Sequence, residues 1–355
     1  MSTVSSTPRG QLLGQYCQAI LLAKGDPMAA HAFAQGQGSN WAQTALHLKG
    51  AVAALSTDNS GELSYPVQSD FAEMLRPLTI IGRLQGLRRV PFNCKMISNV
   101  TGASAAWIGV GIPIPLSALD FDRGANLEWC KVASLVAVTT ELIRSSAPAV
   151  ATVLANDIAR AAAYVADLAF LDPENGGSAG VKPASVLFGA DSIPSIGSSV
   201  AQIDADLRGA LAILNNAAVG LDTATWIMAP HTAVFLSTVR GSGGAAAYPL
   251  VTAKGGVLMG LPVLTSGAII QDANSPTETY IALVAASEIS VADDGESVID
   301  VSTHAAIQMD GAPSAGAAQL VDLWSHGLAG LKATRTINWA LRRPDAVACI
   351  SGVTY

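Results

Sequence analysis

Charged residues are scarce in this chain, and that scarcity limits where its apolar surface can go. They make up 13% of the 355 residues, about half the share in an ordinary soluble domain, while half of all residues are hydrophobic. Such a chain must bury its apolar surface either in a membrane or against other subunits. The longest charge-free run, residues 96–119, contains two prolines, three glycines and Asn99, which disfavours a membrane helix. With no N-terminal signal pattern, we expect a soluble protein with extensive subunit contacts.

The cysteines indicate the redox environment of the protein, and the net charge limits the kind of partner that it can bind. The four cysteines are scattered without a CxxC pair, which favours buried thiols in a reducing compartment. A formal net charge of −7 argues against a nucleic-acid binder of the basic-patch type. It leaves open a container that encloses nucleic acid without gripping it.

Three segments have a clear local pattern. Residues 8–55 have helical spacing with a break near Gly36–Asn40, and a polar linker follows. Residues 96–131, rich in glycine, proline and β-branched residues, predict a long two-stranded excursion. Residues 148–171 predict a helix about 36 Å long, with Ser146 as N-cap and Pro148 in its first turn. Its predicted apolar face consists of Val150, Leu154, Ile158, Ala161, Val165 and Leu168.

The second half of the chain alternates helices and strands. Helices are expected at about 203–214 and 231–239, with a strand at 225–228 between them. Further strands are expected at 260–264, 280–285, 289–291 and 298–301, and another strand-like run closes the chain. No internal repeat is present.

The succession of these segments resembles the major capsid proteins of tailed bacteriophages, which have the Hong Kong 97-type fold. FAEMLRPLTIIGRL resembles the N-terminal arm of that family, and residues 96–131 resemble its extended loop. CKVASLVAVTTELIRSSAPAVATVLANDIARAAAYVADLAFLDPENG resembles its strand, turn, spine helix and glycine-rich loop. WIMAPHTAVFLSTVR, GGVLMGLPVLTSGAI and LVDLWSHGLAGLKATRTINWALRRPDAVACI resemble later segments, including a basic residue before Pro344. The resemblance covers about residues 57–355.

This resemblance implies an α+β fold with a peripheral domain, an axial domain, an extended loop and an N-terminal arm. The axial domain would gather around five- and six-fold axes. The implied division is a helical extension at 1–56, the arm at 57–95, the extended loop at 96–131, the peripheral domain with the spine helix at 132–200, the axial domain at 201–317, and closing strands that return to the peripheral domain at 318–355.

The resemblance also implies a function and a set of partners. The chain would be a structural subunit that self-assembles as hexamers and pentamers into an icosahedral shell around double-stranded DNA. Further partners would be a portal and, in some relatives, scaffold or decoration proteins. The shell would be part of the virion and would assemble in the cytoplasm of the bacterial host. We expect no catalytic residue, no metal, no cofactor and no contact with a membrane.

Two groups of residues are candidates for contacts between subunits. The extended loop carries four apolar residues that would otherwise expose an apolar patch: Trp107, Ile108, Ile112 and Ile114. The stretch from Arg76 to Lys95 contains basic residues and no acidic one. It predicts an arm that grips an acidic neighbour, lines a shell facing DNA, or is a solvated basic surface. Its candidate contacts are Arg76, Arg83, Arg88 and Arg89.

Two alternatives remain open at this point. A bacterial nanocompartment shell of the encapsulin type has the same fold and encloses enzymes in place of DNA. An α/β enzyme would need a nucleophile and a base, and the only GxSxG string surrounds Ser178. That string follows a long helix, where a strand is required, so we interpret it as a flexible loop. No pair of histidines has the spacing of a metal site.

Overall fold

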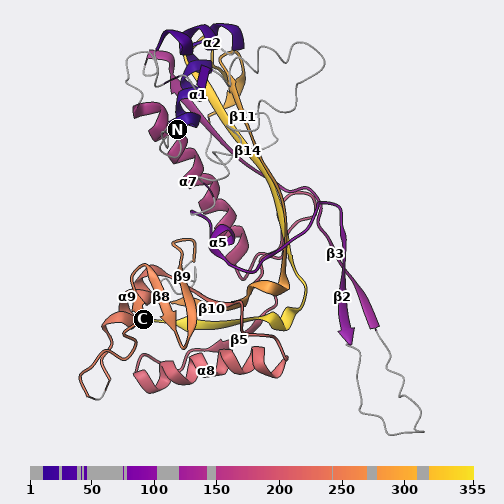
Figure 1. Cartoon of the computed structure of the whole chain (residues 1–355), viewed down its shortest axis with the longest axis vertical. Helices are drawn as coiled ribbons and strands as arrows, with labels where there is room; N and C mark the ends of the chain where they lie inside the picture. Colours follow the sequence, from indigo (N-terminus) through magenta and orange to yellow (C-terminus); the bar gives the residue numbers. More distant parts are fainter. Residues whose placement is uncertain are drawn as a thin grey trace, which may run out of the picture. The chain divides into compact units, whose positions relative to one another are not determined.

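The structure is a computed structural model in which contacts divide the chain into two compact units. The first unit comprises Met1–Arg83, Lys131–Ala166 and Gly295–Thr336, and the second comprises Leu84–Cys130, Asp167–Asp294 and Ile337–Tyr355. Figure 1 follows the chain through its helices and strands. The structure describes residues 11–23, 26–37, 41, 44–45, 75, 78–101, 120–141, 149–241, 243–269, 278–309 and 320–355.

The first unit contains the long strands of a four-stranded sheet. Its order is β1-β11-β14-β4, and β4 (Lys131–Thr139) runs antiparallel to β14 (Leu328–Leu341). The register joins Thr336 to Lys131 at one end and Leu328 to Thr139 at the other. The other two strands are β11 (Ile289–Ser302) and β1 (Arg88–Arg89), and a separate hairpin pairs β12 (Ala306–Gln308) with β13 (Leu320–Asp322).

The spine helix α7 (Ala149–Leu171) occupies the predicted range. In the first unit it packs through Ile158 and a set of alanines against Leu331 and Ala333 of β14. The predicted apolar face was wrong for Ala161 and Val165, which are exposed. Alanines allow a helix to approach a sheet closely, so α7 turns its small residues inward and leaves larger ones outside. The buried alanines of α7 are Ala159, Ala162, Ala163, Ala166 and Ala169.

Two helices precede the long strands in the first unit. They are α1 (Gln11–Leu22) and α2 (Pro27–Gly36), so helical structure is confirmed here, with an additional break that the prediction did not include. Pro27 explains that break, because proline fits only the first turn of a helix, and the Asp26 side chain accepts a hydrogen bond from the Met28 N–H at 2.9 Å. Tyr16 of α1 packs against the cluster formed by α7 and β14.

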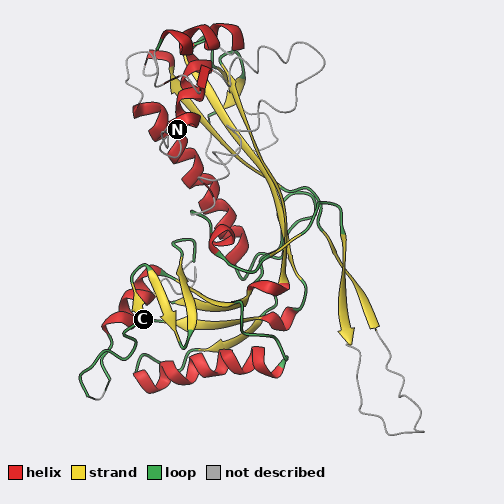
Figure 2. Ribbon diagram, viewed as in Figure 1, coloured by secondary structure: helices red, strands yellow, loops and turns green. Residues whose placement is uncertain are grey.

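A seven-stranded sheet forms the core of the second unit, in the order β5-β15-β10-β6-β9-β8-β7. Its central strands β15, β10 and β6 are almost entirely buried, as expected for apolar runs covered on both faces. Helix α8 (Val200–Asn216) runs along the sheet and contacts β15 and β5 (Figure 2). The strands are β5 (Asp191–Pro194), β15 (Val347–Val353), β10 (Thr279–Ala285), β6 (Ala224–Met228), β9 (Leu261–Thr265), β8 (Gly255–Leu258) and β7 (Val251–Thr252).

The core of this sheet is well packed. Trp226 of β6 and Leu283 of β10 lie opposite each other in the antiparallel register, and both are fully buried. Leu207 of α8 and Ile350 of β15 belong to the same cluster. A second helix, α9 (Pro230–Thr238), follows β6 directly and begins with a proline.

The last strand, β15, lies inside the seven-stranded sheet, where it pairs with β10 and β5. The return of residues 318–355 to the peripheral domain stays a prediction. An apolar strand can be buried in any sheet, and its partners are decided by long-range packing that its own sequence does not encode. Residues 167–200 belong to the second compact unit.

Candidate subunit interface

The base of the extended loop is an antiparallel pair of strands. Strand β2 (Lys95–Thr101) pairs with β3 (Asp120–Asn126), with Lys95 opposite Asn126 and Thr101 opposite Asp120. In the described part of the chain these two strands pair only with each other. The two-stranded excursion is therefore confirmed at its base. The four predicted contact residues of its tip, Trp107, Ile108, Ile112 and Ile114, lie outside the described residues.

The structure brings two of the four candidate arginines together. Arg88 and Arg89 form β1, both are exposed, and β1 pairs in parallel with β11 at the edge of the four-stranded sheet. Arg83 lies half-buried at the end of the short helix α5 (Ile80–Arg83), and Arg76 lies outside the described residues. Charges on an edge strand discourage unspecific strand pairing, and the same two guanidinium groups can bind an acidic surface.

An exposed tryptophan lies on the turn between β13 and β14. Trp324 is 72% exposed, whereas its neighbour Leu323 is fully buried. Single exposed apolar side chains are common on protein surfaces, but tryptophans are enriched among the residues that carry most of the binding energy at interfaces. The sequence did not indicate Trp324 as a contact residue. The Ser-His-Gly that follows it predicts a turn, and a residue on a turn is often exposed.

Main-chain hydrogen bonds hold this turn in one shape. Leu328 N donates to Leu323 O at 2.8 Å, and Gly327 N donates to Trp324 O at 3.2 Å. Thr140 binds the Gly327 carbonyl twice, from its N–H at 2.9 Å and its hydroxyl at 3.0 Å. Because the turn is fixed before any partner arrives, little conformational entropy remains to be lost when Trp324 is buried.

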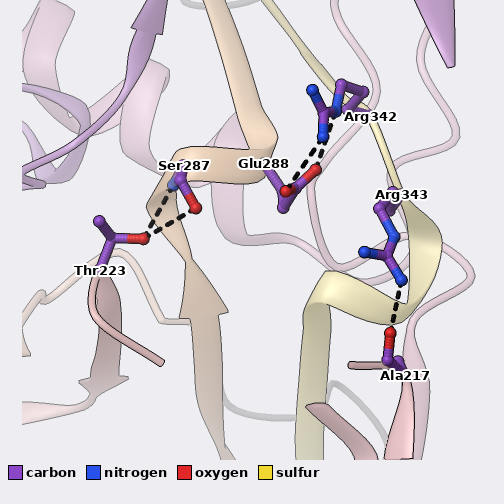
Figure 3. Close-up of polar contacts among 6 residues, drawn as sticks. All are labelled: Ala217, Thr223, Ser287, Glu288, Arg342 and Arg343. Atoms are coloured by element: carbon purple, nitrogen blue, oxygen red, sulfur yellow. Dashed lines mark hydrogen bonds and ion pairs between the residues drawn. The ribbon is translucent and has the colours of Figure 1, made fainter. Parts of the chain in front are cut away.

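A cluster of polar contacts fixes the strands where they leave the seven-stranded sheet (Figure 3). Strand β10 passes through the 3-10 turn η2 (Ala286–Glu288) into β11. Arg342, just after β14, binds Glu288 through Nε to Oε2 at 2.9 Å and Nη2 to Oε1 at 3.2 Å. The Arg342 N–H also donates to the Glu288 carbonyl at 2.9 Å. This two-point contact allows one geometry and is among the stronger hydrogen bonds that proteins form.

Neighbouring contacts extend the same cluster. The Thr223 hydroxyl donates to Ser287 Oγ at 3.0 Å and accepts from the Ser287 N–H at 3.1 Å. Arg343, the basic residue before Pro344, donates from Nη2 to the Ala217 carbonyl at 2.5 Å. Arg343 thus binds a carbonyl just past the end of α8, where a positive charge is stabilised by the helix dipole. The role of this basic residue is structural.

A concavity of about 550 Å³ lies in the second unit, beside Trp339, and includes Ser178 of the GxSxG string. Ser178 and Lys182 exchange main-chain hydrogen bonds of 2.7 and 2.9 Å, so the string forms a tight turn. Cys130 and Glu128 also line this concavity. The pKa of the Cys130 thiol is raised, mainly because the thiol is buried and secondly because the Glu128 carboxylate is nearby. The thiol is thereby kept protonated, which is the opposite of what a nucleophile needs.

Among the residues that the structure describes, no group of three or more histidine, cysteine, aspartate or glutamate side chains could hold a metal ion. None of the helices in the described ranges is both long enough and apolar enough to span a membrane.

Comparison with known proteins decides the family. The sequence matches the phage capsid family over residues 71–352. The chain belongs to the phage capsid family. The match confirms the family that the order of its segments predicted. The matched range lies within residues 57–355, where the resemblance was found.

One relative is close in sequence. A capsid polyprotein of Pseudomonas phage PAJU2 is 38% identical over 327 residues, which cover 87% of the capsid protein described here and 48% of that relative. The chain thus spans about half the length of this curated relative. What the polyprotein does beyond the matched half does not transfer to the chain.

Solved structures confirm the fold. A chain of Gordonia phage Cozz is similar with a TM-score of 0.57 at 17% identity, over 77% of this chain and 86% of that one. A chain of Mycobacterium phage Ogopogo gives 0.58 at 14% identity, over 77% and 91%. The capsid of a native GTA particle, computed with C5 symmetry, gives 0.50 at 16% identity, over 79% and 90%. The α+β fold of the Hong Kong 97 type is thereby established for this capsid protein.

Proposed function

We propose that this capsid protein self-assembles as hexamers and pentamers into a closed icosahedral shell that encloses double-stranded DNA. The observation that supports this most directly is the fold shared with capsid chains, one of them from a particle computed with C5 symmetry. Five copies around one axis, each built on the same sheet and spine helix, are the repeating unit that such a symmetry requires. The scarcity of charge in the chain fits a subunit that buries much of its surface against copies of itself.

The extended loop supplies one class of contact in this proposal. Its base leaves the rest of the described fold as an isolated pair of strands, β2 and β3. A two-stranded hairpin is marginally stable by itself in water, so it needs a surface to pack against. In this proposal Trp107, Ile108, Ile112 and Ile114 pack against a neighbouring subunit. Arg88 and Arg89 bind an acidic surface of a neighbour.

The N-terminal helices supply a second class of contact. Tyr16 packs against the cluster formed by α7 and β14, and Leu22 packs against Val138 and Ala329. We propose that residues 1–56 remain in the particle and stabilise α7, β4 and β14 by packing against them. A portal, with scaffold or decoration proteins, completes the particle, which belongs to the virion and assembles in the bacterial cytoplasm.

Expression of the full chain in bacteria, followed by electron microscopy and nucleic-acid extraction from purified particles, tests this function. Shells that contain double-stranded DNA when the remaining phage proteins are present are expected. Shells that contain enzymes in place of DNA would point to a nanocompartment and contradict the proposal.

A further inference from the structure

The seven-stranded sheet has two ends, and both carry exposed apolar side chains. In the order β5-β15-β10-β6-β9-β8-β7, strand β5 lies at one end and the β7–β8 hairpin at the other. We define the β5 end as Phe188, Asp191 and Ile196, and the β8 end as Leu250, Lys254, Val257 and Met259. Both sets belong to the same compact unit.

The β8 end is an apolar surface on a rigid hairpin. Leu250 is 66% exposed, and Val257 and Met259 are each 40% exposed. The Val257 N–H donates to the Leu250 carbonyl at 3.1 Å, so these two residues are neighbours. Gly256 has φ +144°, and a Cβ there would collide with the Leu250 carbonyl, so the backbone approach requires glycine.

The β5 end is also apolar and fixed in position. Phe188 is 53% exposed and Ile196 is 62% exposed, and they flank β5 on either side. The Ile196 N–H donates to the buried carboxylate of Asp206, which also accepts a 2.8 Å hydrogen bond from the Ser195 hydroxyl. These bonds to α8 hold Ile196 in place.

Each of the two sets contains one charged residue, and the two have opposite signs. Asp204 of α8 also lies near the β8 end, because it accepts a 2.7 Å hydrogen bond from the hydroxyl of Tyr248, and Arg208 lies 3.8 Å from it. Lys254 is the only charged residue between positions 241 and 270, and Asp191 is the only one between 183 and 203. Both residues are exposed. A contact between two β8 ends would bring Lys254 against Lys254, whereas a contact between a β8 end and a β5 end pairs Lys254 with Asp191. Opposite charges at the rim of an apolar contact favour the second arrangement and select against the first.

We propose that the β8 end of one subunit docks on the β5 end of the next copy of the same chain. Two different surfaces that bind each other head to tail generate a ring when the rotation between copies closes. The inference rests on the proposed function, because it assigns the contact that joins neighbours within a pentamer or hexamer. Apolar contacts among Leu250, Val257, Phe188 and Ile196 supply the affinity, and the charges set the direction of the ring.

Charge exchange in the full chain tests this contact. Lys254→Asp and Asp191→Lys each place like charges together, so each is expected to raise the protein concentration for half-maximal assembly about fivefold or more at low salt. The double variant Lys254→Asp/Asp191→Lys restores an opposite pair and should assemble close to the unaltered chain. Assembly is measured by sedimentation of purified protein, and circular dichroism checks that each variant is folded.

A matched control separates the pairing from the change in net charge. Lys254→Asp/Asp222→Lys has the same net charge as the double variant, and exposed Asp222 precedes β6 in the middle of the sheet. This control should remain impaired. If it is rescued equally well, or if neither single exchange weakens assembly of a chain that forms shells, the contact is wrong while the proposed function stands. If the unaltered chain stays monomeric under all salt conditions, both are wrong.

Discussion

Replacing Arg342 by methionine is expected to lower the free energy of unfolding of the second unit by about 2–3 kcal/mol. Arg342 holds Glu288 at two points, with donor–acceptor distances of 2.9 and 3.2 Å, and the side chains are 32% and 14% exposed. A charged hydrogen-bonded pair contributes about 1.5–3 kcal/mol, and removing the cation leaves the Glu288 carboxylate largely buried without it. The exposure of Arg342 to water keeps the loss below that of a fully buried pair.

A double-mutant cycle with urea denaturation of dissociated subunits measures this contribution. Glu288→Gln alone should cost about 1–2 kcal/mol, and the double variant should be less destabilised than the sum of the two single ones. Arg208→Met is the matched control, because Arg208 and Asp204 are 3.8 Å apart and their side chains are 73% and 30% exposed. It should cost less than about 0.5 kcal/mol. An Arg342→Met variant that is no less stable than this control would refute the reasoning.

Three further outcomes are expected. Trp324→Ala should reduce shell assembly about tenfold and leave the unfolding free energy unchanged, because a 72% exposed side chain adds little to the fold; normal assembly of the variant would remove Trp324 from the interface. Burial, and secondly the nearby Asp206 carboxylate, raise the pKa of the Tyr355 hydroxyl to about 12. The unfolding free energy should therefore fall as the pH rises from about 10 to 12, because the unfolded chain loses this proton first. Urea titration at each pH should show a shallower fall in Tyr355→Phe. Denaturing gels of mature particles should show this protein as one monomer band, because the loop between Lys95 and Lys131 contains no lysine whose amine could form a covalent bond to a neighbouring subunit. A ladder of multimers that resists reductant would contradict this.

Elements with strong local signals could be predicted from the sequence. Pro148 and the periodic apolar residues predicted a helix over residues 148–171, and the structure has α7 at Ala149–Leu171. The apolar run of β6 and the proline that follows it likewise predicted a strand and the helix α9. These features depend on residues close together in the chain, so local pattern is sufficient.

Features that depend on distant residues could not be predicted. Arg342 and Glu288 are 54 residues apart, and nothing near either one indicates the other. The pairing of β15 with β10 is decided by which sheet has room for another apolar strand. The predicted buried face of α7 was wrong for Ala161 and Val165. An amphipathic pattern is recognised by its large apolar residues, whereas mostly alanines of α7 pack against the sheet.

The candidate contacts divide in the same way. The sequence pointed to Arg88 and Arg89 through an unbalanced run of positive charge, and the structure places both on an exposed strand. Trp324 and the two ends of the seven-stranded sheet emerged only from exposure in the fold. A sequence does not distinguish an apolar residue that is buried in its own subunit from one that is left for a neighbour.

Electron microscopy of the purified full-length protein, over a range of salt and protein concentrations, tests the central claim most directly. If this chain is a shell-forming capsid subunit, images should show closed icosahedral particles or free pentamers and hexamers, with little monomer at high concentration. A well-folded monomer or dimer under every condition would contradict the account.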